Sequence, residues 1–479
     1  MRTLTRYFGN LWLISALFML IPFGAAYIYQ ESANLFVLSA LFSIVIGLLL
    51  RFLAQKLPAK EEGLSLSHGL LLAALAFFFL PMMGAISFLP SMNYQIIDAL
   101  FESFSGFTTT GLTIYSSLTD LPKSLLLWRA LTQWLGGIGI VMVFLFLYSQ
   151  LRAHHYTKLA DLTTRTKTTV ALYQAQGMGD ELSGGLKDSV TRVMLIYLVY
   201  SILGIFLLWL VGLSLFEAIA LTFTALSTGG FTVTDVLPSS AGSLLILSLL
   251  MLIGSISFAT HHYLFRRQFK KFIYAFEKNV LLIILLVMIV ISWLSFPNLQ
   301  VVVFQLISAL TTTGYSISAI ALLPHLFIMM MMVAMIIGGS ANSTAGGIKV
   351  FRCYYLLRGI IWSVEKMVSP RAAVIPLKIH TRKVDVVQMA NIGIFCFAYL
   401  LLLLVGTALF MLFGYSFFDS SFQMISALGT VGLQTMDLAV LAAPLKVTLI
   451  IAMLLGRLEI FPLLILARSA YRSLRFSKA

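Results

Sequence analysis

The residues best placed to do chemistry in this chain form one short pattern that occurs four times. A threonine is followed two positions later by a glycine and then by a bulky apolar residue. These TxG segments read Thr109-Thr110-Gly111, Thr228-Gly229-Gly230, Thr312-Thr313-Gly314 and Thr430-Val431-Gly432. Glycine reaches backbone angles that other residues avoid, and rings of backbone carbonyls can replace the hydration shell of an ion. The pattern therefore predicts a cation filter of four backbone segments, to which the threonine hydroxyls add further oxygens.

Alignment on the glycine distinguishes these segments from ordinary turns. A single Thr-X-Gly sequence is usually no more than a turn. Here, the residue six positions before the glycine carries a hydroxyl in all four copies. These residues are Ser105, Thr224, Ser308 and Ser426. Four copies in one register indicate four related structures.

Each TxG segment follows an apolar run that is too short to cross a membrane. About ten helical residues rise only about 15 Å, half of the hydrocarbon core. Such a half-helix must enter and leave by the same face, and the irregular backbone after it must line water or be buried in protein. We expect half-helices at 97–107, 216–226, 302–310 and 419–428. Longer runs flank them at 65–89 and 125–149, at 191–213 and 243–264, at 278–296 and from 325 to a break at 338, and at 389–413 and 445–467.

Three of the four half-helices are expected to begin with an acid. Asp98, Glu217 and Asp419 align with one another, whereas the third copy has Val301 at this position. A carboxylate there offsets the positive end of the helix dipole, and the negative end then faces the TxG segment. This polarity favours a cation.

The composition indicates that lipid is the solvent of this chain. Hydrophobic residues make up 60% of its 479 residues and charged residues only 10%, more apolar surface than a soluble interior can hide. We predict an all-α integral membrane protein with four pseudo-symmetric helix–pore-loop–helix units around a central pore and an extra N-terminal transmembrane hairpin at about 9–29 and 33–53. The predicted segments are the hairpin (1–60), unit 1 (61–150), a cytoplasmic loop with unit 2 (151–265), unit 3 with an intramembrane gate (266–362), and a second cytoplasmic loop with unit 4 (363–479).

The net charge of +14 does not indicate a nucleic-acid partner, because the basic residues do not form one patch. About 28 of the 32 Lys and Arg residues fall in loops on the N-terminal side of the predicted spans, as the positive-inside rule requires of cytoplasmic loops. Lys123, Arg129 and Lys446 fall on the opposite side, and Arg457 falls within a span. We therefore expect both termini in the cytoplasm and the TxG segments facing outward.

A glycine-rich stretch interrupts the last apolar run of the third unit. It reads Gly338-Gly339-Ser340-Ala341-Asn342-Ser343-Thr344-Ala345-Gly346-Gly347, and we call it the glycine loop. So many glycines cannot hold a regular helix. Beneath the filter, this loop would narrow the pore and act as a movable gate; the alternative is a passive break in packing. A phosphate-binding loop is disfavoured because no Gly-Lys-Ser/Thr sequence follows.

Two basic residues are candidates for the gate. Arg457 lies in the last apolar run, where an arginine costs roughly 3 kcal/mol unless it faces protein or water. It is either a fixed positive charge that hinders cations and donates to carbonyls of the loop, or a structural partner of another helix. Lys349 follows the glycine loop and either reaches the same cavity or lies at the membrane interface.

Three further stretches resemble the Trk/Ktr/HKT superfamily of cation-translocating subunits, most closely its bacterial TrkH/TrkG branch. They are 132–139 (TQWLGGIG), 337–349 (IGGSANSTAGGIK) and Gly456-Arg457. The resemblance implies potassium uptake across the bacterial inner membrane by a homodimer with one pore per subunit. It also implies a cytosolic TrkA-like nucleotide-binding ring as partner, potassium as substrate and no cofactor in this chain. One departure is Ala345, where the branch usually has glycine.

Two other functions are alternatives to potassium uptake. A sodium-coupled or sodium-selective relative is the main alternative; some sodium-selective relatives replace the first filter glycine by serine, and here all four are glycine. A membrane enzyme would need paired acids, a nucleophile–base pair or metal ligands within the spans. Arg457 and Glu459 are almost the only charges expected there, so an enzyme is disfavoured. The sequence does not separate a channel from a symporter.

Overall fold

The computed structural model describes residues 2–58, 66–157, 186–370, 375–379, 382–384 and 386–460. The regular secondary structure of this part of the chain is helical except for one short hairpin of strands, β1 (Lys378–Ile379) and β2 (Arg382–Lys383). Seven of its helices are long and apolar enough to cross a membrane, or eight if one bent pair counts as a span. The protein is therefore an all-helical, multi-pass membrane protein.

The helices follow one another in the order that the hydropathy pattern predicts. The N-terminal hairpin is α1 (Arg2–Phe18), α2 (Leu20–Ile28) and α3 (Asn34–Lys56). The next two groups are α4 (Leu66–Gly84), η1 (Ala85–Phe88), η2 (Pro90–Met92), α5 (Ile96–Phe107) and α6 (Lys123–Thr157), then α8 (Leu186–Leu210), α9 (Leu215–Leu226), α10 (Ala241–Ser255), α11 (Phe258–Phe265) and α12 (Phe269–Ile273). The last two are α13 (Phe276–Ser295), α14 (Leu299–Leu310), η3 (Ile320–Leu322), α15 (His325–Ile337) and α16 (Val350–Val368), then α17 (Val386–Leu412), α18 (Phe417–Leu428) and α19 (Ala443–Arg457).

The half-helices are α5, α9, α14 and α18, and each has 12 residues. Asp98, Glu217 and Asp419 lie in the first turns of α5, α9 and α18, as predicted. Glu217 forms a capping box with Ser214. The third half-helix has no acid in its first turn, and Asn298 caps it instead by accepting a hydrogen bond from the Val301 amide at 3.3 Å.

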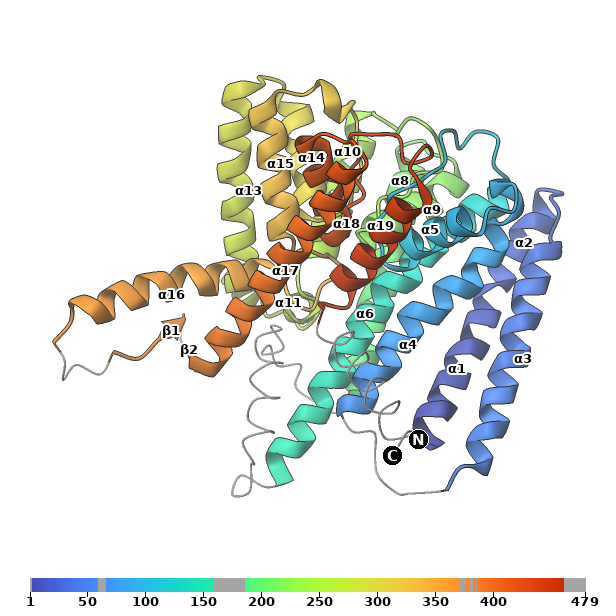
Figure 1. Cartoon of the computed structure of the whole chain (residues 1–479), viewed down its shortest axis with the longest axis horizontal. Coiled ribbons are helices and arrows are strands. Elements are labelled where there is room, and N and C mark those ends of the chain that lie inside the picture. The colour runs from blue at the N-terminus through green and yellow to red at the C-terminus, as the bar shows by residue number, and fades with distance from the viewer. Residues whose placement is uncertain are drawn as a thin grey trace.

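The half-helices are enclosed by a cyclic set of helix contacts. The long helix after each TxG segment packs against the half-helix of the next group: α6 on α9, α10 on α14, α15 on α18, and α19 back on α5. In Figure 1 the half-helices lie together in the upper part of the molecule, while α1 and α3 lie side by side at its right edge. The N-terminal hairpin is therefore peripheral to this ring of contacts.

One predicted span is wrong in detail, and another is described only in part. The run at 243–264 was expected to be continuous, but α10 and α11 meet at 107°. The carbonyls of Gly254 and Ser255, which lie at the break, accept hydrogen bonds from the amides of the glycine loop. The run at 445–467 is also predicted to cross. Helix α19 covers this run as far as Arg457, and residues 461–467 lie outside the described part of the chain. The break near 338 was predicted and is present, because α15 ends at Ile337.

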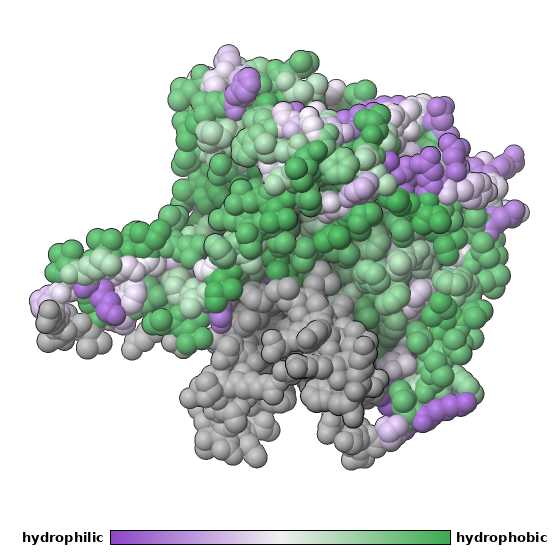
Figure 2. Space-filling model, in the orientation of Figure 1, coloured by the Kyte–Doolittle hydropathy of each residue, from purple (hydrophilic) through white to green (hydrophobic). Residues whose placement is uncertain are grey.

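The outer surface is suited to lipid. Figure 2 shows a broad apolar face, with hydrophilic side chains gathered mainly at the upper right and in smaller groups at the lower right and the left end. Large side chains such as Leu286 on α13 and Phe397 and Leu404 on α17 are exposed. Helix α16 projects from the body at the left of Figure 1.

One carboxylate attaches the N-terminal hairpin to the rest of the protein. Glu31, between α2 and α3, accepts hydrogen bonds from the Lys123 amide at 2.7 Å and from the Ser124 amide at 2.9 Å. These amides are at the start of α6, where the backbone N–H groups have no partner within the helix. Glu31 is thus a helix cap supplied from more than ninety residues away in sequence.

We predict that Glu31→Ala lowers the free energy of unfolding by about 1 kcal/mol, the usual value of a helix N-cap. Thermal unfolding in detergent measures this change. The control is Gln30→Ala, because the neighbouring Gln30 is exposed. Equal midpoints for the two variants would contradict the capping role.

Candidate functional site

The four TxG segments meet in a closed ring. A Cβ atom placed on any of the four glycines would collide with the carbonyl oxygen of the X residue in the next segment. The separations would be 2.0 Å from Gly111 to Gly229 O, 1.9 Å from Gly230 to Thr313 O, 1.9 Å from Gly314 to Val431 O, and 2.3 Å from Gly432 to Thr110 O. Each glycine thus allows one segment to approach its neighbour, and the fourth segment returns to the first.

The backbone of each segment has the same unusual conformation. The first threonine has a φ between 50° and 55°, and the glycine has a φ between 77° and 98°. The X residue between them has no positive φ. Alternation of this kind turns successive carbonyls toward one side of a strand. Glycine adopts a positive φ at little cost, whereas the threonines must be held there by their surroundings.

Hydrogen bonds from the half-helices hold these segments. The amide of each X residue donates to the backbone carbonyl of the serine or threonine that lies six positions before the filter glycine. These bonds join Thr110 to Ser105 at 2.9 Å, Gly229 to Thr224 at 2.8 Å, Thr313 to Ser308 at 2.9 Å, and Val431 to Ser426 at 2.8 Å. The amides are therefore used within the protein. Most carbonyls of the segments remain available to a cation, although the Gly229 carbonyl also accepts a hydrogen bond from Gln133 at 2.7 Å.

The four threonine hydroxyls are not equivalent. Within the described residues, the Oγ1 atoms of Thr109 and Thr430 are buried without a hydrogen-bond partner. Thr228 donates to the Ser227 carbonyl at 2.7 Å, and Thr312 accepts from the Gly346 amide at 2.7 Å. Two of the four hydroxyls are thus free to ligate an ion.

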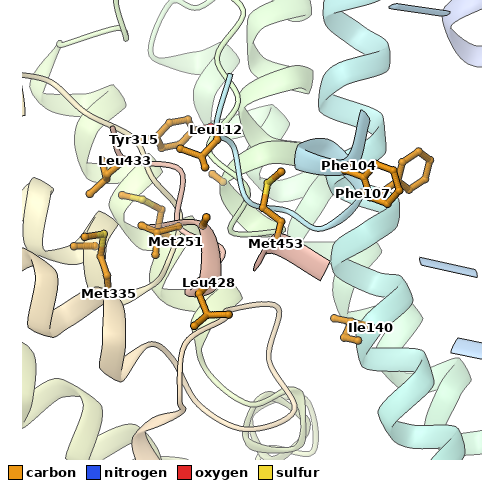
Figure 3. Close-up of a cluster of buried hydrophobic side chains, with 14 of the residues drawn as sticks. Phe104, Phe107, Leu112, Ile140, Met251, Tyr315, Met335, Leu428, Leu433 and Met453 are labelled. Atoms are coloured by element: carbon orange, nitrogen blue, oxygen red, sulfur yellow. The ribbon is translucent and has the colours of Figure 1, made fainter. Parts of the chain in front are cut away.

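Apolar side chains surround the ring. The residues directly after the glycines are Leu112, Phe231, Tyr315 and Leu433, and all are at most 2% exposed. Figure 3 shows Leu112, Tyr315 and Leu433 close together, with Met251 and Met453 below them. These side chains keep the carbonyl-rich backbone in a dry surrounding, where electrostatic interactions with an ion are stronger.

The glycine loop lies directly against the ring. The Gly346 amide contacts Thr312, and the Gly347 amide donates to the Gly429 carbonyl at 3.1 Å. Thr344 Oγ1 lies 2.8 Å from the Gly254 carbonyl and 3.1 Å from the Leu226 carbonyl. The loop is therefore attached to the second, third and fourth groups at once.

Arg457 and Lys349 both bind the glycine loop. Arg457 donates to the Thr344 carbonyl at 2.6 Å and to the Gly136 carbonyl at 2.9 Å. Lys349 donates to the Ala345 carbonyl. Both side chains are buried, and they line one small cavity with Ile140, Ala345, Gly346, Gly456 and Glu459. The predicted gate residues are thus brought together, and Arg457 is the last residue of α19.

Glycines in the stretch 132–139 and in Gly456-Arg457 allow helices to pack closely. A Cβ on Gly136 would lie 2.0 Å from the Phe107 carbonyl, and one on Gly456 would lie 2.0 Å from the Leu428 carbonyl. Helices α6 and α19 therefore approach the C-terminal ends of α5 and α18 with no side chain between them.

Several buried charges were not predicted from the sequence. Glu102 and Arg129 form an ion pair at 2.7 Å with side chains at most 1% exposed. Glu459 pairs with Arg352, which lies on α16. The expectation that Arg457 and Glu459 were almost the only charges within the spans is therefore wrong. The sequence does distinguish Glu102. Of the four residues that stand nine positions before a filter glycine, it is the only charged one; the others are Leu221, Gln305 and Gln423.

A pair of glycine variants tests the ring. Gly314 and Gly414 have nearly equal positive φ values of 87° and 90°, but only Gly314 has backbone atoms where a Cβ would lie. Both Ala variants incur about 1–2 kcal/mol of backbone strain. We expect Gly314→Ala to abolish cation uptake into proteoliposomes and Gly414→Ala to retain it. Equal uptake by the two variants would contradict the close approach at the ring.

Comparison with known proteins assigns the family. The family model described as "TrkH: Cation transport protein" matches residues 33–478. An uncharacterized cation transporter of Methanocaldococcus jannaschii is 30% identical, with 98% of this chain and 96% of the relative covered. The Trk system potassium uptake protein TrkH of Halomonas elongata is also 30% identical, with 98% and 99% covered.

A solved structure agrees with these matches. The crystal structure of the potassium transporter TrkH from Vibrio parahaemolyticus superposes with a TM-score of 0.83 at 26% identity, and covers 97% of this chain and 98% of that chain. The family consists of cation transporters and not of enzymes. This chain belongs to the TrkH cation transport family.

Proposed function

We propose that this protein takes up potassium through the ring of TxG segments, which serves as its selectivity filter. The observation that carries the proposal is the cyclic set of glycine–carbonyl contacts, from Gly111 round to Gly432. The names of the TrkH relatives, which are potassium uptake proteins, support the choice of ion. In the proposed arrangement, four pseudo-symmetric units surround a central pore, with units at 61–150, 151–265, 266–362 and 363–479 and the hairpin 1–60 outside them.

The half-helices stabilise a cation at the ring electrostatically. Their C-terminal ends point toward the TxG segments, and the partial negative charge there favours a cation. An ion that enters the ring exchanges water for carbonyl oxygens, and for the free hydroxyls of Thr109 and Thr430.

The glycine loop and Arg457 form the proposed gate. In this structure the loop is fixed by bonds from Arg457 and Lys349 and by its own contacts with Thr312 and Gly429. The positive charges of the buried Arg457 and Lys349 side chains repel a transported cation. Opening therefore requires that the loop and Arg457 move apart or move together away from the axis.

The assembly and orientation are also part of the proposal. We place the protein in a bacterial inner membrane as a homodimer, with both termini in the cytoplasm and a TrkA-like nucleotide-binding ring below it. The distribution of Lys and Arg supports the orientation.

Gly432→Ser tests the filter. Gly432 has the widest clearance of the four glycines, 2.3 Å, so a serine here disturbs the ring least. We expect it to lower potassium uptake relative to sodium uptake in proteoliposomes, because altered carbonyl positions discriminate less between the two ions. An unchanged ratio in the folded variant would contradict the filter. A wild-type protein that prefers sodium would favour the alternative of a sodium-selective relative.

Deletion of residues 340–346 tests the gate. Two backbone hydrogen bonds hold the ends of the loop together: the Ile348 amide donates to the Ile336 carbonyl, and the Lys349 amide donates to the Ile337 carbonyl, both at 2.9 Å. The chain can therefore close after the deletion. We expect basal potassium flux to rise while α15 and α16 stay in place. Flux that is unchanged or lost in a folded, dimeric variant would show that the loop is only a packing element.

A further inference from the structure

We propose that Arg129, oriented by Glu102, is a positioning residue that holds the strand directly after the second TxG segment, so that ion discrimination depends on an ion pair outside the filter. This inference rests on the proposed function of the ring. It concerns two residues that lie in none of the TxG segments and not in the glycine loop.

The four half-helices differ at one aligned position. Nine positions before the filter glycine stand Glu102, Leu221, Gln305 and Gln423. In the third half-helix, Gln305 donates to Ser316 at 2.7 Å and to Ser318 at 3.1 Å, directly beyond its own glycine. This side chain thus braces the strand that leaves the third segment.

Glu102 braces the first segment in the same way. Its carboxylate accepts hydrogen bonds from Thr113 Oγ1 at 3.0 Å and from the Ile114 amide at 3.4 Å. Thr113 and Ser316 occupy the same register, two positions after the glycine. The bracing geometry therefore recurs in the first and third groups.

The second half-helix has no such brace, because Leu221 carries no polar group. Its strand is held instead from the first group, by two residues one turn apart on α6. Arg129 donates to the Thr232 carbonyl at 3.0 Å. Gln133 donates to the Gly229 carbonyl at 2.7 Å and accepts from the Phe231 amide at 3.0 Å. The second segment thus depends on its neighbour for its position.

Glu102 holds Arg129 in place for this contact. Arg129 Nε lies 2.7 Å from Glu102, its guanidinium also donates to Thr113 at 3.2 Å, and its Cζ lies 4.1 Å from the centre of the Phe231 ring. The planar, multidentate guanidinium suits several fixed acceptors at once. One guanidinium therefore links the strands that follow the first and second filter glycines.

The test measures the ratio of sodium to potassium uptake in proteoliposomes for Arg129→Gln. A hydrogen bond from a charged group contributes enough free energy that its loss can change an equilibrium about tenfold or more. We expect the sodium to potassium ratio to rise by about tenfold. A purely structural role would lower thermal stability and total flux but leave the ratio unchanged.

Two further variants keep the test decisive. If Arg129→Gln does not fold because Glu102 is left buried and unpaired, the double variant Glu102→Gln/Arg129→Gln removes both charges and should show the same raised ratio. The matched control is Lys446→Gln, which breaks another ion pair between groups, with Asp98 at 2.7 Å at the start of α5. This control should keep the wild-type ratio.

The outcomes separate this inference from the proposed function. A wild-type ratio in folded Arg129→Gln, or in the folded double variant, would overturn the inference. If Gly432→Ser changes the ratio in the same assay, the filter stands and only the role of Arg129 fails. If neither variant changes the ratio, the proposed filter fails as well.

Discussion

The structure depends on four contacts between a glycine and a neighbouring carbonyl. A ring of carbonyls can replace the water around an ion only if the strands come close together, and a single Cβ at Gly230 or Gly314 would lie 1.9 Å from the next strand. The strands also need positive φ values that threonine tolerates poorly. Everything around the ring therefore serves to hold a backbone that would not adopt this form alone.

Three layers supply that support. The half-helices bind the amides of the TxG segments and direct their negative ends toward the ring. Helices α6 and α19 pack closely on α5 and α18 because Gly136 and Gly456 remove any side chain between them. Beneath, the glycine loop joins three of the four groups through Thr344, Gly346 and Gly347. The backbone of the ring has nearly fourfold symmetry, but the contacts that hold each of the four TxG segments differ.

Much of this arrangement could be predicted from the sequence, for identifiable reasons. The half-helices were predicted because their length and apolar character are local properties, and the glycine loop because it breaks an apolar run. The bend between α10 and α11 could not be predicted, since it depends on the amides of Ser340 and Thr344 from a distant part of the chain. The Glu102–Arg129 and Arg352–Glu459 pairs were missed for the same reason. The roles of Arg457 and Lys349 in gating remain proposals.

The most direct test of the proposed potassium filter is uptake of potassium, rubidium and sodium by the purified wild-type protein in proteoliposomes, with and without an imposed membrane potential. If the four TxG segments form a potassium filter, potassium and rubidium enter in preference to sodium, and a potential, negative inside, increases their uptake. Uptake of sodium in preference to potassium, or no discrimination between them, would contradict a potassium filter formed by the four TxG segments.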